Sequence, residues 1–324
     1  MDRRKFLCTG VLSLLALKFG NKLSAQNLSE TDSQQATGFG PVTCENISAG
    51  KDDLKVRFLG TGPADWKPGS KGRRMSSILV EDKFLIDFTL SVEDMLPKNV
   101  HPTEIFYTHS HIDHFQPDRA LLAGIQKVYL SETWADIAAK RFQTAAEQTG
   151  KSVPEIIPLK IGKPVTLHGV TLTPLPANHA TKNLDEQTLI YLIEKGTTAE
   201  RLGVRLLYAT DTHSILVRAS RLAGIDKYIK QGRPITAFIM EATMGFKQDE
   251  DNIRIYNHTS ILTVSKIVNR LIATQRYLPP QGQPAYLTHV GQYGKLSQEE
   301  LNASLPVPLR ASYDGLDVVF KAVN

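Results

Sequence analysis

Cysteine is nearly absent from this sequence of 324 residues, which contains only Cys8 and Cys44. We expect Cys8 to be removed with an N-terminal signal, so Cys44 would stand alone in the mature chain and no intramolecular disulfide can form. Oxidising compartments normally favour disulfides. A chain of this length, 41% hydrophobic, can bury enough apolar surface to be stable without them.

An apolar run of membrane-spanning length is also missing. A transmembrane helix needs roughly 20 apolar residues, and the apolar run Leu7–Phe19 is shorter. The charged start, this run and the small residues that end at Ala25 are typical of a signal peptide. The adjacent Arg3 and Arg4 resemble the twin-arginine export signal, which is used by proteins that fold before they cross the membrane.

These features predict a twin-arginine signal peptide over residues 1–25, with cleavage near Ala25. The twin-arginine export machinery would then be a partner, and the mature protein would be periplasmic or otherwise exported, without a membrane anchor after cleavage. The alternatives are an ordinary Sec signal and an uncleaved anchor.

A basic excess is missing from the expected mature chain. The full sequence has a net charge of +5, but residues 1–25 contain five basic residues and one acidic residue, so their removal leaves +1. Proteins that bind nucleic acid polymers usually keep a basic face or stripe. We therefore expect a small-molecule substrate and no nucleic acid polymer as a partner.

Large apolar residues are scarce in residues 26–52, which are rich in Ser, Thr, Gln, Asn and Gly and predict a flexible linker. Strand-like and helix-like segments then alternate without an internal repeat, which favours one α/β domain over residues 53–324. Helical periodicity is clearest in Trp134–Gln148 and Ile261–Thr274. Strands are predicted at Leu54–Leu59, Ser77–Asp87 (a hairpin), Glu104–Thr108, Lys127–Leu130, Val165–Leu175, Leu189–Glu194, Arg205–Ala209, Ile235–Met240, Ala285–Thr288 and Asp317–Phe320.

Five predicted strands lead into polar side chains that can bind a metal or move a proton. In α/β proteins, ligand crevices open at the carboxyl ends of strands. We therefore expect these side chains to meet at one site. They are His109, His179, Asp211, Glu241 and His289.

The densest group of potential metal ligands is the run His109-Ser110-His111-Ile112-Asp113-His114. Imidazole and carboxylate suit zinc or another first-row divalent ion, and a short loop can direct neighbouring residues toward two ions. The alternative is a polar loop that is rich in histidine by chance. The spacing, directly after a buried strand, favours metal binding.

This run matches the His-x-His-x-Asp-His hallmark of the metallo-β-lactamase superfamily, which the sequence resembles from Leu54 to Phe320. A Gly-rich turn, Phe58-Leu59-Gly60-Thr61-Gly62, and a strand ending in Asp87 precede the hallmark in the same order. The resemblance implies a four-layer αββα sandwich with two divalent metal ions, Zn²⁺ or alternatively Mn²⁺. It assigns His109, His111 and His179 to one ion, Asp113, His114 and His289 to the other, and Asp211 as the bridge between them.

Less specific roles exist for several of these residues. His179 and His289 could be ordinary loop histidines, and Asp211 could cap a helix that begins near Ser214. Asp87 could be a plain turn residue, whereas the resemblance implies that it orients a ligating imidazole.

Two short motifs indicate one branch of this superfamily. Glu241-Ala242-Thr243 and Asn257-His258-Thr259-Ser260 resemble motifs of tRNA 3′-processing endonucleases and of the phosphonate-pathway cyclic phosphodiesterase. Phosphodiester cleavage expels an alkoxide, which an imidazolium can protonate while a carboxylate keeps the ring charged. His258 would be the acid and Glu241 its partner. Alternatively, the second motif only caps the following helix and His258 is incidental.

The resulting hypothesis is a dinuclear metal-dependent phosphodiesterase. Two ions would activate water and stabilise the phosphate oxygens, and His258 would assist the leaving group. The chain lacks both the basic tRNA-gripping insertion of the endonucleases and the cysteine cluster of the cyclic phosphodiesterase. We therefore expect a small or cyclic phosphodiester as the substrate.

Two other functions fit the same metal ligands. A lactone or carboxylic ester hydrolase needs the activated water, but its leaving group can be protonated through Asp211 without an acid at His258. A metal-dependent ligand-binding protein needs no catalysis, although the complete ligand set argues against it. The sequence does not decide between a monomer and a homodimer.

Overall fold

The computed structural model describes residues 49–324, except 227, 230–231, 247–252 and 292–295. The expected signal peptide and the expected linker up to residue 48 lie outside the described residues. In the part that is described, no helix is long and apolar enough to cross a membrane.

The described strands form two seven-stranded sheets, ordered β14-β1-β2-β3-β4-β5-β6 and β13-β12-β11-β10-β9-β8-β7. The strands of the first sheet are β1 Leu54–Gly60, β2 Ser77–Val80, β3 Phe84–Ile86, β4 Glu104–Phe106, β5 Lys127–Ser131, β6 Glu155–Leu159 and β14 Asp317–Phe320. Those of the second sheet are β7 Val165–Leu167, β8 Val170–Pro176, β9 Leu189–Lys195, β10 Val204–Ala209, β11 Ala237–Glu241, β12 Ala285–Thr288 and β13 Leu309–Ala311.

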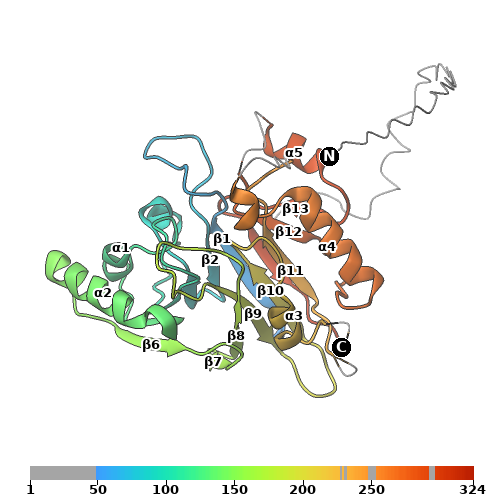
Figure 1. The fold of residues 1–324 in the computed structure, drawn as a ribbon, viewed down its shortest axis with the longest axis horizontal. Coiled ribbons are helices and arrows are strands. Elements are labelled where there is room, and N and C mark those ends of the chain that lie inside the picture. Colours follow the sequence, from blue (N-terminus) through green and yellow to red (C-terminus); the bar gives the residue numbers. More distant parts are fainter. Residues whose placement is uncertain (1–48, 227, 230–231, 247–252, 292–295) are drawn as a thin grey trace, which may run out of the picture. The chain divides into compact units, whose positions relative to one another are not determined.

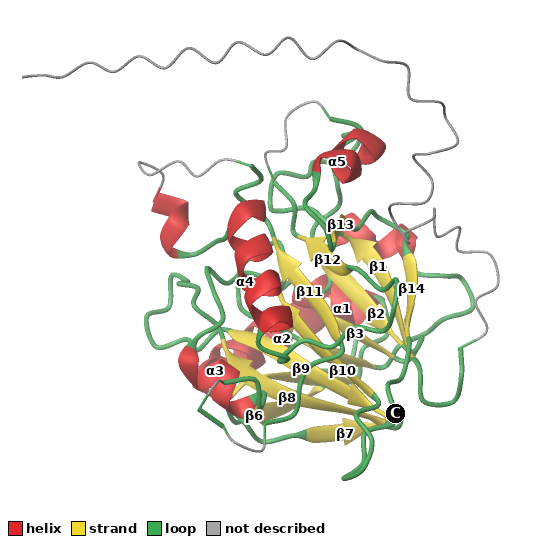
Figure 2. Ribbon diagram, turned by 90° about the vertical axis from the view of Figure 1, so that its right-hand side faces the viewer, coloured by secondary structure: helices red, strands yellow, loops and turns green. Residues whose placement is uncertain are grey.

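Helices cover the outer face of each sheet (Figures 1 and 2). α1 (Pro117–Leu122) and α2 (Ala135–Thr149) pack against the first sheet, and α3 (Val217–Leu222), α4 (Ile261–Ala273) and α5 (Gln298–Ser304) pack against the second. In the described residues, three short 3₁₀ helices lie in the connections, at Leu90–Met95, Glu132–Trp134 and Ile253–Tyr256. The layers are therefore helix, sheet, sheet and helix, which confirms the predicted αββα sandwich.

Successive side chains of the central strands point to opposite faces of the sheet, and this alternation produces the layers. In β9, Leu189, Tyr191 and Ile193 face the core between the two sheets, while Ile190 and Leu192 face the helices of the second sheet. All five side chains are buried. Full burial of a large apolar side chain contributes about 1.5–3 kcal/mol relative to exposure, so both faces of this strand stabilise the sandwich.

One prediction is wrong: a segment that we expected to be a single strand reverses direction and forms two. The segment Val165–Leu175 is a hairpin of β7 and β8, because His168 (φ 51°) and Gly169 (φ 75°) both adopt the left-handed conformation. Two consecutive residues of this kind form the tight turn that suits a two-residue hairpin. A histidine at the first position is an unusual turn signal, so the apolar alternation hid it. The short edge strands β6 and β13 carry weak patterns and were not predicted.

Strand direction explains why the polar side chains gather at one edge. β10, β11 and β12 are parallel neighbours. β8 runs in the same direction as β10, because both pair antiparallel with β9. Their carboxyl ends therefore share one edge of the second sheet, as do those of β3 and β4 in the first sheet.

Candidate metal centre

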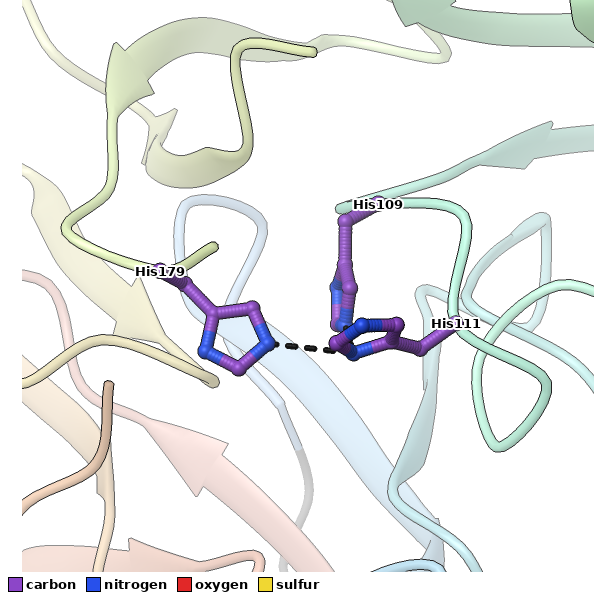
Figure 3. A group of neighbouring side chains, drawn as sticks. All are labelled: His109, His111 and His179. Atoms are coloured by element: carbon purple, nitrogen blue, oxygen red, sulfur yellow. Dashed lines mark hydrogen bonds between the residues drawn. The ribbon is translucent and has the colours of Figure 1, made fainter. Parts of the chain in front are cut away.

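Three histidines from two segments of the chain meet at the first half of the site. His109 and His111 follow β4, and His179 follows β8. Nδ1 of His111 lies 3.0 Å from Nε2 of His109 and 3.1 Å from Nε2 of His179. Figure 3 shows the three rings converging on one point, which is the arrangement that one metal ion requires.

The second half of the site consists of Asp113, His114 and His289, whose potential ligand atoms also lie within 4.8 Å of one another. Asp211 lies between the two halves. Its Oδ2 atom is 3.0 Å from Nε2 of His114 and 3.3 Å from Nε2 of His289, and its Oδ1 atom is 3.8 Å from Nε2 of His179. Each carboxylate oxygen therefore faces a different half, as a bridging ligand would.

Four of these histidines contact a partner through Nδ1 and turn Nε2 inward. This outer contact is the usual way in which proteins fix the tautomer and orientation of a metal-binding imidazole. The partners of Nδ1 are Thr108 Oγ1 for His109 (2.9 Å), Asp87 Oδ2 for His114 (2.7 Å), the Asn257 carbonyl for His179 (3.1 Å) and Thr243 Oγ1 for His289 (2.7 Å).

Asp87 lies where the orienting role requires it. Its buried carboxylate contacts Nδ1 of His114 and accepts hydrogen bonds from the amide and the hydroxyl of Thr108, each at 2.8 Å. Burial raises the pKa of Asp87 above its ordinary value, although His114 opposes this shift. One carboxylate thus holds both ends of the hallmark loop.

Left-handed backbone recurs at the ends of three strands that build the site. Asp87, Asp211 and His289 have φ angles of 58°, 48° and 48°. Few residues other than glycine adopt this conformation, and Asp and His are among those that tolerate it best. Such residues concentrate at functional sites. Asp211 does not cap a helix, because α3 begins only at Val217 after Leu216.

The residues present fit two divalent ions. Nε2 of His114 and Nε2 of His289 are buried and lie 3.0 and 3.3 Å from Oδ2 of Asp211. An ion held between these imidazoles and Asp211 would give each buried nitrogen the partner that a buried polar atom needs. Burial lowers the pKa of His114, but Asp211, Asp113 and Asp87 raise it well above its ordinary value. A metal ion would replace that proton.

Glu241 and His258 form a pair beside the metal ligands. Nδ1 of His258 lies 3.0 and 3.2 Å from the two oxygens of the Glu241 carboxylate, which is buried and also accepts a hydrogen bond from the Thr212 amide at 2.7 Å. Burial lowers the pKa of His258, but Glu241 raises it to about 9. The motif Asn257-His258-Thr259-Ser260 also caps the following helix, because the Ser260 side chain is the N-cap of α4. Capping and the contact with Glu241 coexist.

Distance alone also permits groupings that include His258. Its ring lies with His179 and Asp211, and with Glu241 and His289, within the same 4.8 Å limit. The resemblance, however, assigns His258 to neither ion, and its Nδ1 atom pairs with the Glu241 carboxylate, as an acid and its partner would. We therefore treat His258 as a neighbour of the metal ligands and not as one of them.

Two neighbours of His258 make contacts that the sequence did not indicate: Asn257, which belongs to the same motif, and His213, which follows Asp211 by two residues. The Asn257 side chain accepts a hydrogen bond from the Ala180 amide at 3.2 Å, next to the contact of its carbonyl with His179. The carbonyl of His258 accepts from Nδ1 of His213 at 3.0 Å. These contacts join segments 45 to 78 residues apart, so no local pattern indicates them.

The site opens into a cleft of about 370 Å³. Among the described residues that line the cleft, Arg254 is the one Lys or Arg. The lining residues are Pro63, Ala64, Asp65, His111, Asp113, Asp211, Thr243, Arg254, His258, His289 and Gly291.

Residues 86–264, more than half of the chain, match the family described as the beta-lactamase superfamily domain. No curated protein sequence matches the chain. Three solved structures show the same fold. Zn²⁺-bound PqqB from Methylobacterium extorquens is 13% identical with a TM-score of 0.58, over 82% of this chain and 99% of its own.

Yeast PDE1 is 10% identical with a TM-score of 0.57, over 83% of this chain and 99% of its own. The long form of RNase Z from yeast is 14% identical with a TM-score of 0.53, over 85% of this chain and 42% of its own. The match over residues 86–264, with the His and Asp groups that suggest a dinuclear site, shows that the chain belongs to the beta-lactamase superfamily, whose members are mostly metal-dependent hydrolases.

Proposed function

We propose that this protein is a metal-dependent phosphodiesterase that hydrolyses a small or cyclic phosphodiester outside the cytoplasm. One observation carries the proposal: the imidazole of His258 lines the cleft beside the candidate ligands and contacts both oxygens of the buried Glu241 carboxylate. A positioned imidazolium is what an alkoxide leaving group needs. Hydrolysis of an activated ester does not need it.

When bound, two divalent ions supply Lewis-acid activation of water and of the phosphate oxygens. The protein's own residues supply the remaining steps. Nδ1–H of His258 is donated to Glu241, so the proton on Nε2 is the one that the ring can deliver to the departing oxygen. Asp211 faces the two halves of the centre with its two oxygens, which leaves the acid role to His258. Arg254 adds positive charge to the wall of the cleft, where an anionic substrate would lie.

Two proteins of similar fold support this proposal through their names, one a ribonuclease and the other a phosphodiesterase. The zinc in PqqB supports the choice of a divalent ion. The small volume of the cleft, about 370 Å³, suits a small or cyclic diester better than a polymer.

The experiment that tests the proposal compares two leaving groups in the His258→Ala variant. The variant should retain its metals yet lose roughly 10²- to 10⁴-fold in kcat with an alkoxide leaving group. The loss should be much smaller with a nitrophenolate, which departs without a proton. His168→Ala is the matched control, because His168 is exposed in the turn before β8, at the opposite end of that strand from His179.

Equal losses with both leaving groups would refute the role of His258. A different result would identify a lactone or carboxylic ester hydrolase. In that case the parent protein shows no detectable phosphodiesterase activity, and the variant still hydrolyses lactones. Ligand binding without turnover of any ester would identify a binding protein.

Export through the twin-arginine machinery is part of the same proposal and rests on Arg3, Arg4 and the apolar run that follows. Exchanging both arginines for lysine should block export and leave folded protein in the cytoplasm, because the arginine pair is the recognised signal. Cell fractionation measures the outcome. Unimpaired export of the double variant would assign the protein to the Sec route.

A further inference from the structure

The carboxylate of Glu186 contacts both chain segments that carry the first three histidines. Its Oε1 accepts a hydrogen bond from the Ser110 amide at 2.7 Å, and its Oε2 accepts from the Ser110 hydroxyl at 2.6 Å. Oε2 also accepts from the Thr181 hydroxyl at 3.0 Å. Ser110 separates His109 from His111, and Thr181 follows His179 by two residues. One side chain therefore ties the hallmark loop to the loop after β8.

His111 needs such support more than its neighbours do. The other four histidines of the centre have an outer partner on Nδ1, whereas His111 turns Nδ1 inward. In the described part of the chain, the hydrogen-bond contacts of its ring are those with His109 and His179. Its position therefore depends on the backbone that carries it, and Glu186 holds that backbone at the adjacent Ser110.

We propose that Glu186 is a positioning residue for the metal ion of His109, His111 and His179, acting through the Ser110 backbone in place of an outer partner on His111. Hydrogen bonds to an ionised carboxylate are stronger than neutral ones. The inference rests on the metal dependence of the proposed function and is independent of the substrate class. Neither the hallmark motif nor the spacing of the ligands includes Glu186.

The test measures zinc binding to the full protein by competition with a chromogenic chelator. Glu186→Ala should weaken one of the two zinc sites by about 10- to 100-fold, the usual effect of losing an outer partner of a metal site, and leave the other unchanged. Glu186→Gln should recover part of the affinity, because its amide oxygen still accepts from the Ser110 amide. Asp185→Asn, in the same loop and exposed, should bind zinc as the parent protein does.

Ser110→Ala provides a second route if Glu186→Ala does not fold. It removes the hydroxyl contact and keeps the amide contact, so it should weaken the same zinc site by a smaller factor. In the double variant, the loss should equal that of Glu186→Ala alone, since the two changes remove one shared contact.

Parent-like zinc affinity at both sites in Glu186→Ala, or in Ser110→Ala, would overturn the inference. Equal weakening of both zinc sites, together with a lower melting temperature of the metal-free protein, would also overturn it and show general structural support. A parent protein that binds no zinc or manganese would contradict the proposed function itself.

Discussion

Single imidazole nitrogens decide the chemistry of the candidate centre. The Thr108 hydroxyl donates to Asp87, so its oxygen can accept the Nδ1 proton of His109. The hydroxyl of Thr243 donates to Glu241 in the same way and accepts from His289. A proton on Nδ1 leaves the Nε2 lone pair for a metal ion. Each threonine hydroxyl thus links a buried carboxylate to an imidazole, and this link fixes the tautomer that a metal ligand needs.

We predict that the purified protein binds two divalent ions per chain, and that His111→Ala and His289→Ala each remove mainly one of them. The two residues belong to different halves of the centre, so the remaining half keeps its own ligands. Elemental analysis after reconstitution with zinc or manganese measures the stoichiometry, with His168→Ala as the control. Finding no bound metal in the parent protein would refute the assignment.

At the scale of elements, the 3₁₀ helix Ile253–Tyr256 and the residues after it place His258, the proposed acid. The Asn257 and His258 amides both contact the carbonyl of Arg254, and the Asn257 side chain and carbonyl then contact the loop after β8 at Ala180 and His179. A strand-end loop that carries a candidate metal ligand therefore also supports the segment that carries His258. The backbone carbonyl of Asn257 contacts the metal-ligand side, and its side chain anchors the segment that carries His258.

We predict that Asn257→Ala lowers kcat for alkoxide leaving groups by about tenfold, because a hydrogen bond contributes about 0.5–1.5 kcal/mol and its loss releases the segment before His258. Asn257→Asp keeps the acceptor for the Ala180 amide and should stay close to the parent protein. Metal content should be unchanged in both variants. An alanine variant with parent-like kcat for both leaving groups would show that this contact does not position the acid.

At the scale of the whole described domain, Asp53 joins its first strand to its last. Asp53 precedes β1, and its carboxylate accepts hydrogen bonds from the Ala322 amide and the Lys321 ammonium group, which follow β14, both at 2.9 Å. The Gly50 amide donates to it as well, at 2.8 Å. Burial raises the pKa of Asp53, but these three donors lower it below its ordinary value of 3.8.

We predict that Asp53→Asn lowers the melting temperature by about 2–4 °C at pH 7, equivalent to about 1 kcal/mol. Because the folded-state pKa is lowered, the carboxylate contributes stability above its ordinary pKa and loses it as the pH falls through the folded-state value. The difference between variant and parent should therefore shrink below about pH 4. Thermal unfolding of chelator-treated protein measures it, with Asp94→Asn, whose carboxylate pairs with Arg74 and is exposed, as the control. A difference independent of pH would contradict this account.

Much of the site could be predicted from the sequence, because its residues follow buried strands whose pattern is local. The hallmark residues lie within one short loop, and His179, Asp211, Glu241 and His289 each come at or after the carboxyl end of an apolar run. Parallel strands bring such ends to one edge. The sequence by itself therefore determined which side chains gather at the candidate centre, and the resemblance of the hallmark run to a known superfamily implied the αββα fold class.

The tertiary structure alone decided how those side chains are held. The contacts of Glu186 with Ser110 and of Asn257 with His179 join residues 76 and 78 positions apart. The first contact joins loops of the two sheets, and the second joins two loops at one edge of the second sheet. The orientation of each imidazole follows from such contacts. Periodicity reports which face of a strand is buried, but it carries no information about which polar atoms meet across a packed interface.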